Sequence, residues 1–216
     1  SELILALYPD AVIAEDGSWT SAAGADETPK TIYVRGTIHL STNAAGRVLK
    51  AEDFKDPAFD FDAYVAYAKP SVWNANPANW DAPRSRPAPV TGPLEDARAR
   101  SADNQARIVN IPIGSNTSLL GLGRDARIVK GQIQVSGRSN VVIRNITFED
   151  AFDHFPEWTP TDSFSLSTPA VPGCQAAYID GDTGPQKCPG GRWNTEYDNV
   201  QIFNSKNVWV DHCTFT

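Results

Sequence analysis

Methionine is absent from the 216-residue sequence, which begins with Ser1. We therefore expect that residue 1 is not a translation start. Two explanations stay open: a signal peptide has been removed, or the chain has been cut from a longer one.

Long apolar segments are also absent. No run approaches the roughly 20 residues that a membrane-spanning helix needs, so we expect a soluble protein with no membrane partner. The composition is 41% hydrophobic, 10% aromatic and 21% charged, which excludes a disordered tail, a collagen-like fibre and a long coiled coil. The length suits one domain and permits two.

The sequence also lacks an excess of basic residues. The sequence has 19 Lys and Arg against 26 Asp and Glu, a formal net charge of −7, so nucleic acid is not an expected partner. An acidic surface also repels a polyanionic polysaccharide. A ligand of that kind would need a local basic patch or a bound cation to offset the charge.

Cysteine is scarce, with three residues in the chain. Cys174 and Cys188 each adjoin a Pro-Gly pair, and this composition predicts a loop closed by a disulfide, as suits an exported protein. Spacing alone does not prove the pairing. Cys213 lies in an apolar stretch instead and is expected to be a small buried strand residue.

Short β-branched segments dominate what the sequence does contain. A strand is predicted over 31–40. Further strands separated by polar turns are expected at 108–113, 118–122, 127–135, 141–148, 200–203 and 208–215. The stretch Asn140–Phe148 aligns with Asn207–Phe215, with a similar apolar pattern around Leu119 and Leu120. A repeat that cannot bury its own apolar face is typical of a solenoid, so we expect a single all-β domain over 1–216, a parallel β-helix.

Four segments interrupt this pattern. Apolar residues at helical spacing predict a short helix near 58–68, and a mostly exposed helix is expected over 94–106 because acidic residues come first and basic ones last. Residues 70–93 are rich in proline and are expected to form an extended surface excursion. Residues 149–197 form a second, longer excursion, and such excursions from a solenoid usually build a functional face.

Taken together, the motifs resemble those of a known family. Residues 32–38, Asn140–Phe148, Asp150–Asp162, Trp193–Asn199 and above all Asn207–Phe215 are similar to the extracellular bacterial pectate lyases of the pectate lyase and pectin lyase superfamily, in their calcium-dependent branch. This resemblance implies a right-handed, single-stranded parallel β-helix. It also implies a secreted, monomeric enzyme that cleaves α-1,4-polygalacturonate, or pectate, by β-elimination.

The chemistry of that reaction supplies a separate reason to expect calcium. The proton at C5 of a galacturonide is poorly acidic and lies beside a carboxylate, whose negative charge makes its removal harder. A hard cation held by protein oxygens can neutralise this carboxylate. By the resemblance, Asp198 is the expected Ca²⁺ ligand, and Asn194 and Asp162 correspond to polar residues near further cation or substrate positions.

The resemblance does not supply a catalytic residue within this sequence. The arginine that removes the C5 proton and the remaining calcium ligands are expected beyond Thr216, so residues 1–216 alone are expected to be incomplete and inactive. Asp211–His212 is interpreted as a structural pair, and His154, His212 and Cys213 lack zinc-site spacing. Two alternatives stay open: a pectin lyase acting on methyl-esterified substrate without calcium, and a non-catalytic carbohydrate-binding β-helix.

Overall fold

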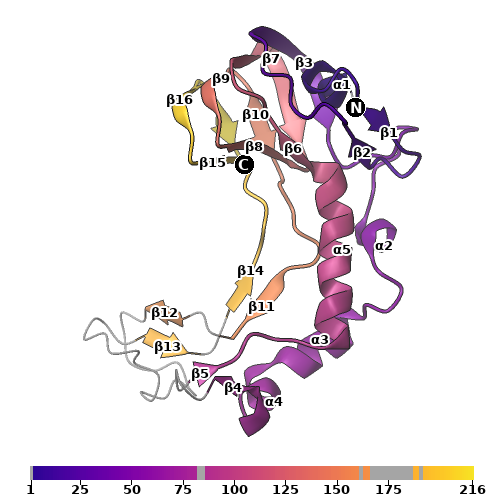
Figure 1. The fold of residues 1–216 in the computed structure, drawn as a ribbon, viewed down its shortest axis with the longest axis vertical. Helices are drawn as coiled ribbons and strands as arrows, with labels where there is room; N and C mark the ends of the chain where they lie inside the picture. Colours follow the sequence, from indigo (N-terminus) through magenta and orange to yellow (C-terminus); the bar gives the residue numbers. More distant parts are fainter. Residues whose placement is uncertain (1, 82–85, 161–162, 166–186, 190–191) are drawn as a thin grey trace. The chain divides into compact units, whose positions relative to one another are not determined.

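The computed structural model describes residues 2–81, 86–160, 163–165, 187–189 and 192–216 (Figure 1). Contacts group the chain into two compact units. The first unit comprises 1–54, 102–154 and 196–216, and the second comprises 55–101 and 155–195. Helix α5 (Pro93–Val109) begins in the second unit and ends in the first.

Parallel strands form the body of the first unit (Figure 1). One sheet has the order β15-β8-β6 and a larger one the order β16-β9-β7-β10-β17, with β3 also paired to β7. The fold is a right-handed parallel β-helix, as predicted. Its strands are β3 (Lys30–His39), β6 (Asn110–Pro112), β7 (Thr117–Val129), β8 (Gln132–Ser136), β9 (Ser139–Arg144), β10 (Thr147–Glu149), β15 (Val200–Phe203), β16 (Lys206–Asp211) and β17 (Thr214–Phe215).

The internal repeat has a direct structural counterpart. Val208 pairs with Val141 and Phe215 with Phe148, so the two aligned segments lie one above the other in adjacent coils. The rings of Phe148 and Phe215 stack with centroids 5.4 Å apart. Leu119 pairs with Ile143, which extends the same register to the preceding coil. Each coil therefore buries the apolar face of its neighbour, as a solenoid requires.

Stacked asparagines mark one corner of the β-helix. Asn116, Asn140 and Asn207 all have positive φ angles, between 54° and 60°, a left-handed conformation that asparagine tolerates better than most residues. Asn207 Nδ2 donates to Asn140 Oδ1 at 3.1 Å, and Asn140 Nδ2 donates to Asn116 Oδ1 at 2.9 Å. This ladder satisfies the side chains that turn the chain from one sheet into the next.

The core of the first unit lies inside the coils. Alternate residues of the strands point inward, and the fully buried ones include Val34, Leu119, Ile133 and Ile143. The short helix α1 (Glu2–Leu7), which the sequence pattern did not indicate, adds Leu3, Ile4 and Leu7 to the same cluster. The remaining elements of this unit are β1 (Val12–Ile13), β2 (Trp19–Thr20) and α2 (Ala51–Phe54).

The second unit is built around aromatic side chains. Tyr64 is fully buried and its hydroxyl donates to Glu95 at 2.5 Å, while Glu95 also pairs with Arg98 at 2.7 Å. Phe61 and Trp193 stack beside Tyr64. Its elements are α3 (Phe61–Ala68), α4 (Pro70–Trp73), the 3₁₀ turn η1 (Pro77–Asn79), β4 (Trp80–Asp81), β5 (Arg86–Pro87), β11 (Glu157–Thr159), β12 (Ser163–Ser165), β13 (Lys187–Pro189) and β14 (Arg192–Asn194).

Helix α5 differs from the sequence expectation in burial. It was expected to be mostly exposed, yet Ala97, Arg98, Ser101, Gln105 and Val109 are all buried. The polar members of this face are hydrogen-bonded: Ser101 Oγ donates to the carbonyl of Ala97, and Gln105 Nε2 donates to that of Phe152. Burial of satisfied polar groups is tolerated, so a polar composition did not mean an exposed helix.

Several element boundaries also differ. Ile108 and Val109 end helix α5 instead of opening a strand, and the excursion 70–93 contains α4, η1, β4 and β5. The strands expected at 118–122 and 127–135 belong to one long strand, β7, followed by β8.

The disulfide stays a prediction because Cys174 lies outside the described residues. Cys213 is free, lies between β16 and β17, and is half-buried. Within the described part of the chain, no helix is long and apolar enough to span a membrane.

Two histidines of the first unit are expected to make its stability depend on pH. Burial lowers the pKa of His39 and His154, and His39 Nδ1 is buried without a hydrogen-bond partner among the described residues. The unfolded chain, with histidine pKa values near 6.5, therefore binds protons that the folded chain excludes. Above about pH 6.5, both rings are neutral in the folded and the unfolded chain, and the folded state keeps its full stability. As the pH falls below this value, proton binding by the unfolded chain lowers the free energy of unfolding.

We expect the free energy of unfolding in urea to decline between about pH 7 and pH 5.5, and His39→Gln to reduce the decline. The same titration of a His154→Gln variant measures the contribution of the second ring. Identical pH profiles for both variants and the unchanged protein would contradict this assignment.

Candidate functional site

A short segment ahead of strand β15 carries the principal candidate ligand, Asp198. Hydrogen bonds fix this segment: Glu196 N–H donates to Asp153 at 3.2 Å, Asp198 N–H donates to Gln132 Oε1 at 2.8 Å, and the carbonyl of Asn199 accepts from Ile133 N–H at 3.1 Å. Asp198 itself is exposed. A carboxylate on a fixed backbone with an accessible head suits the capture of a cation.

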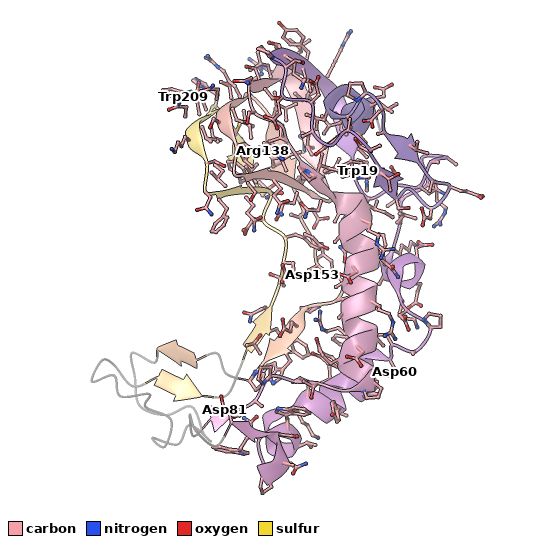
Figure 2. All side chains as sticks on the ribbon, viewed as in Figure 1. Trp19, Asp60, Asp81, Arg138, Asp153 and Trp209 are labelled. Atoms are coloured by element: carbon pink, nitrogen blue, oxygen red, sulfur yellow. The ribbon has the colours of Figure 1, made fainter. Side chains whose placement is uncertain are left out.

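The surroundings of this segment are acidic. Burial raises the pKa of the Tyr197 phenol above its ordinary value, and the negative charges of Asp153, Glu196 and Asp103 raise it further. The phenol therefore stays protonated. Asp153, labelled in Figure 2, is itself buried with 6% of its surface exposed. A negative field of this kind attracts a cation and repels a polyanion.

Side-chain amides continue the site along the sheet. Gln132 is buried and donates its Nε2 to Asn110 Oδ1 at 3.3 Å while its Oε1 holds the Asp198 backbone. Gln134 lies on the outer face, because its neighbours Ile133 and Val135 are buried, and its Nε2 donates to Gln201 Oε1 at 2.9 Å. The outer face therefore presents a polar row beside Asp198, on strands that keep it rigid.

The donor atoms near Asp198 fit calcium in kind. Asp198 and Glu196 are both exposed, on either side of the half-buried Tyr197, and the neighbouring Asn199 Oδ1 is buried without a partner among the described residues. All are oxygen donors, which hard cations prefer. The described residues do not hold a group of three His, Cys, Asp or Glu side chains placed to bind a metal ion.

Of the three sequence-predicted ligands, Asp198 alone lies among the described residues of the first unit. Asn194 belongs to the second unit, where it ends strand β14 and donates to Thr159 Oγ1 at 2.7 Å. Asp162 lies outside the described residues. All three ligand assignments therefore stay predictions.

Sequence reasoning missed Glu196 and Gln132. Glu196 is signalled by its spacing, since a second carboxylate two residues before Asp198 can reach the same side of the chain. Gln132 carried no recognisable signal, because its role depends on two long-range hydrogen bonds.

His212, interpreted as a structural strand residue, lies at a corner with a φ of 52°, and its side chain is 68% exposed.

The fold and this site together define a parallel β-helix with an acidic, amide-lined face. A family model described as pectate lyase matches residues 90–164. The chain is 37% identical over 188 residues to a pectate lyase of Bacillus subtilis, which covers 87% of this chain and 36% of that protein. It is 31% identical over 130 residues to pectate lyase E of Dickeya chrysanthemi, covering 59% of this chain and 26% of that protein.

Solved structures give the same result. The structure of a pectate lyase from Acidovorax avenae subsp. citrulli is similar with a TM-score of 0.72 at 35% identity, covering 99% of this chain and 40% of that one. A pectate lyase bound to a hexasaccharide is similar with a TM-score of 0.66 at 35% identity, covering 90% and 40%. This chain is therefore a relative of the pectate lyases, as the sequence motifs indicated.

Proposed function

We propose that the protein is a secreted, calcium-dependent pectate lyase that cleaves α-1,4-polygalacturonate by β-elimination. The observation that carries this proposal is the fixed, exposed carboxylate of Asp198 in an acidic segment of a β-helix that is 37% identical to a pectate lyase. The chain spans 36% of the length of that relative, so the activity, the substrate and secretion are part of the proposal.

Asp198 would hold the calcium ion, with Glu196 as a second carboxylate in reach of the same exposed side. Bound calcium supplies a positive charge that neutralises the substrate carboxylate and stabilises the charge that develops next to it when the C5 proton leaves. Asn194 and Asp162 are proposed as further cation or substrate ligands on the strength of the family motifs.

The residues around Asp198 contribute position and hydrogen bonds. Gln132 holds the backbone of Asp198 through Oε1, and the outward amides of Gln134 and Gln201 offer donors and acceptors to sugar hydroxyls. In the elimination, a base removes the proton from C5, a double bond forms between C4 and C5, and the C4–O bond to the neighbouring sugar breaks. No residue of 1–216 is assigned as that base.

The test is the formation of unsaturated uronide, which absorbs near 235 nm, from polygalacturonate by the intact protein. We expect product with calcium and none with a chelator. Activity on methyl-esterified pectin that survives the chelator would instead identify a pectin lyase. Binding of the polymer without product would identify a carbohydrate-binding β-helix and would contradict the proposal.

A further inference from the structure

The Asp211–His212 motif lies on a sheet face that the proposed function does not use. Strands β3, β7, β9 and β16 run side by side in the larger sheet (Figure 1). Their register aligns Tyr33 with Leu120, Leu120 with Arg144, and Arg144 with Asp211. Because neighbouring strands lie about 4.8 Å apart, this row crosses about 14 Å of the surface.

A groove of about 390 Å³ follows this row. It is lined by Tyr33, Leu120, Gly121, Leu122, Arg144, Asn145 and His212. Tyr33 is 61% exposed and Leu122 46%, so the groove offers an apolar wall and an accessible aromatic ring.

Asp211 organises the polar end of the groove. Its carboxylate lies 3.2 Å from Arg144 Nε and 2.6 Å from His212 Nδ1. Desolvation raises the pKa of Asp211, but hydrogen bonds from His212 and Trp209 and the charges of His212 and Arg144 outweigh it and hold the pKa below its ordinary value. Asp211 therefore stays ionised and fixes Arg144 and His212 at the end of the row. Trp209, two residues earlier on the same strand, is 64% exposed (Figure 2).

The charges and the ring select one kind of ligand. Arg35 follows Tyr33 by two residues on the same outward side of β3 and is exposed. An exposed arginine therefore lies near Tyr33 on its own strand, and Arg144 lies two strands away on β9. Guanidinium groups bind carboxylates in a planar, bidentate geometry, and aromatic rings pack against apolar ligand faces. A sugar ring that carries a carboxylate offers both features, whereas a neutral sugar offers only the second.

We propose that this groove binds an oligosaccharide of uronate sugars at a second site that needs no metal ion. One ring packs against Tyr33 while the carboxylates pair with Arg144 and Arg35. Arg144 and Arg35 place two positive charges against the one negative charge of Asp211 in a protein of net charge −7. This local excess of positive charge offsets the repulsion that a polyanion meets elsewhere on the surface. The choice of polygalacturonate as the polymer rests on the proposed function. The choice of an anionic sugar rests on the groove.

The test is calorimetric titration of the intact protein with galacturonate trimer in the presence of a chelator. We expect saturable binding that is about tenfold or more weaker for Arg144→Gln and for Tyr33→Ala, because the first loses a charge-assisted hydrogen bond and the second loses the ring. Arg127→Gln is the matched control. Arg127, on β7, is likewise an exposed arginine with an ion pair, to Glu149 at 2.7 Å, and its variant should bind within about twofold of the unchanged protein.

Galactose trimer, which lacks carboxylates, is expected to bind at least about tenfold more weakly than the galacturonate trimer. Equal binding of the two trimers, no binding of galacturonate trimer, or unchanged binding by both groove variants would overturn the inference. The lyase assay is a separate measurement made with calcium. Chelator-resistant binding without lyase activity would refute the proposed function alone, and lyase activity without such binding would refute the second site alone.

Discussion

Gly121→Ala is expected to destabilise the first unit by about 3 kcal/mol or more. A methyl group at this position would lie 1.9 Å from the carbonyl oxygen of Asn145 and 2.8 Å from Ala126 Cβ. The carbonyl cannot move away freely, because Asn145 has a φ of 55° and its Nδ2 donates to the carbonyls of Gly121 and Gly123. The clash is therefore with backbone, and relief requires the coil to shift.

Gly123→Ala is the matched control for this prediction. Gly123 has a φ of 77°, but an added methyl group would meet no atom within 4 Å. Its cost is conformational only, about 1–2 kcal/mol. Urea denaturation of both variants measures the difference. A Gly121→Ala variant as stable as Gly123→Ala would show that the coils separate more easily than their hydrogen bonds indicate.

The repeat was the part of the fold that the sequence predicted best. The Asn140–Phe148 and Asn207–Phe215 segments align by sequence and pair residue by residue in the structure. The physical reason is that a solenoid places equivalent residues in equivalent environments, so the turn asparagines, the inward valines and the stacked phenylalanines recur together. Strand β15 was also predicted with the bounds Val200–Phe203.

The burial of helix α5 was not predictable in the same way. Its polar composition indicated exposure, but Arg98 and Ser101 are buried because distant groups satisfy them. Arg98 donates to the carbonyl of Phe155, and Ser101 Oγ accepts from the backbone N–H of Asp56. Such pairings depend on residues more than 40 positions apart, which no local pattern reveals. Helix α1 was missed because six residues contain too few turns for a periodic signal.

In the candidate site too, local features were predicted from the sequence and long-range contacts were not. Asp198 was predicted because its place before a strand and its motif are local properties. Gln132 was not, because it joins Asn110 to the backbone of Asp198 across strands and leaves no trace in the spacing of charged residues. Sequence reasoning therefore predicted the candidate ligand Asp198 but not the side chain that positions its backbone.

Asp198→Ala is expected to lower the calcium affinity of the intact protein by at least about tenfold and to reduce lyase activity at limiting calcium in proportion. Calcium affinity changes over decades with the number of charged ligands, and even residues that only orient ligands alter affinity by about 10- to 100-fold. The fold should persist, because the side chain is exposed and the contacts that fix this segment come from its backbone N–H and from neighbouring residues. Calorimetric titration with calcium measures the affinity.

Two further variants separate ligand charge from local structure. Asp198→Asn keeps an oxygen donor and the backbone hydrogen bond to Gln132 but loses the charge, so it should fall between alanine and the unchanged protein. Asp125→Ala removes another exposed carboxylate of the first unit, on strand β7 of the larger sheet, whereas Asp198 precedes β15 of the other sheet. It should change calcium affinity by less than about twofold, because solvent and salt screen an exposed charge that does not contact the ion. If Asp125→Ala and Asp198→Ala weaken calcium binding equally, the effect is one of net charge. If neither weakens it, Asp198 is not a ligand. Only a selective loss at Asp198, with excess calcium restoring part of the activity, supports coordination by this carboxylate.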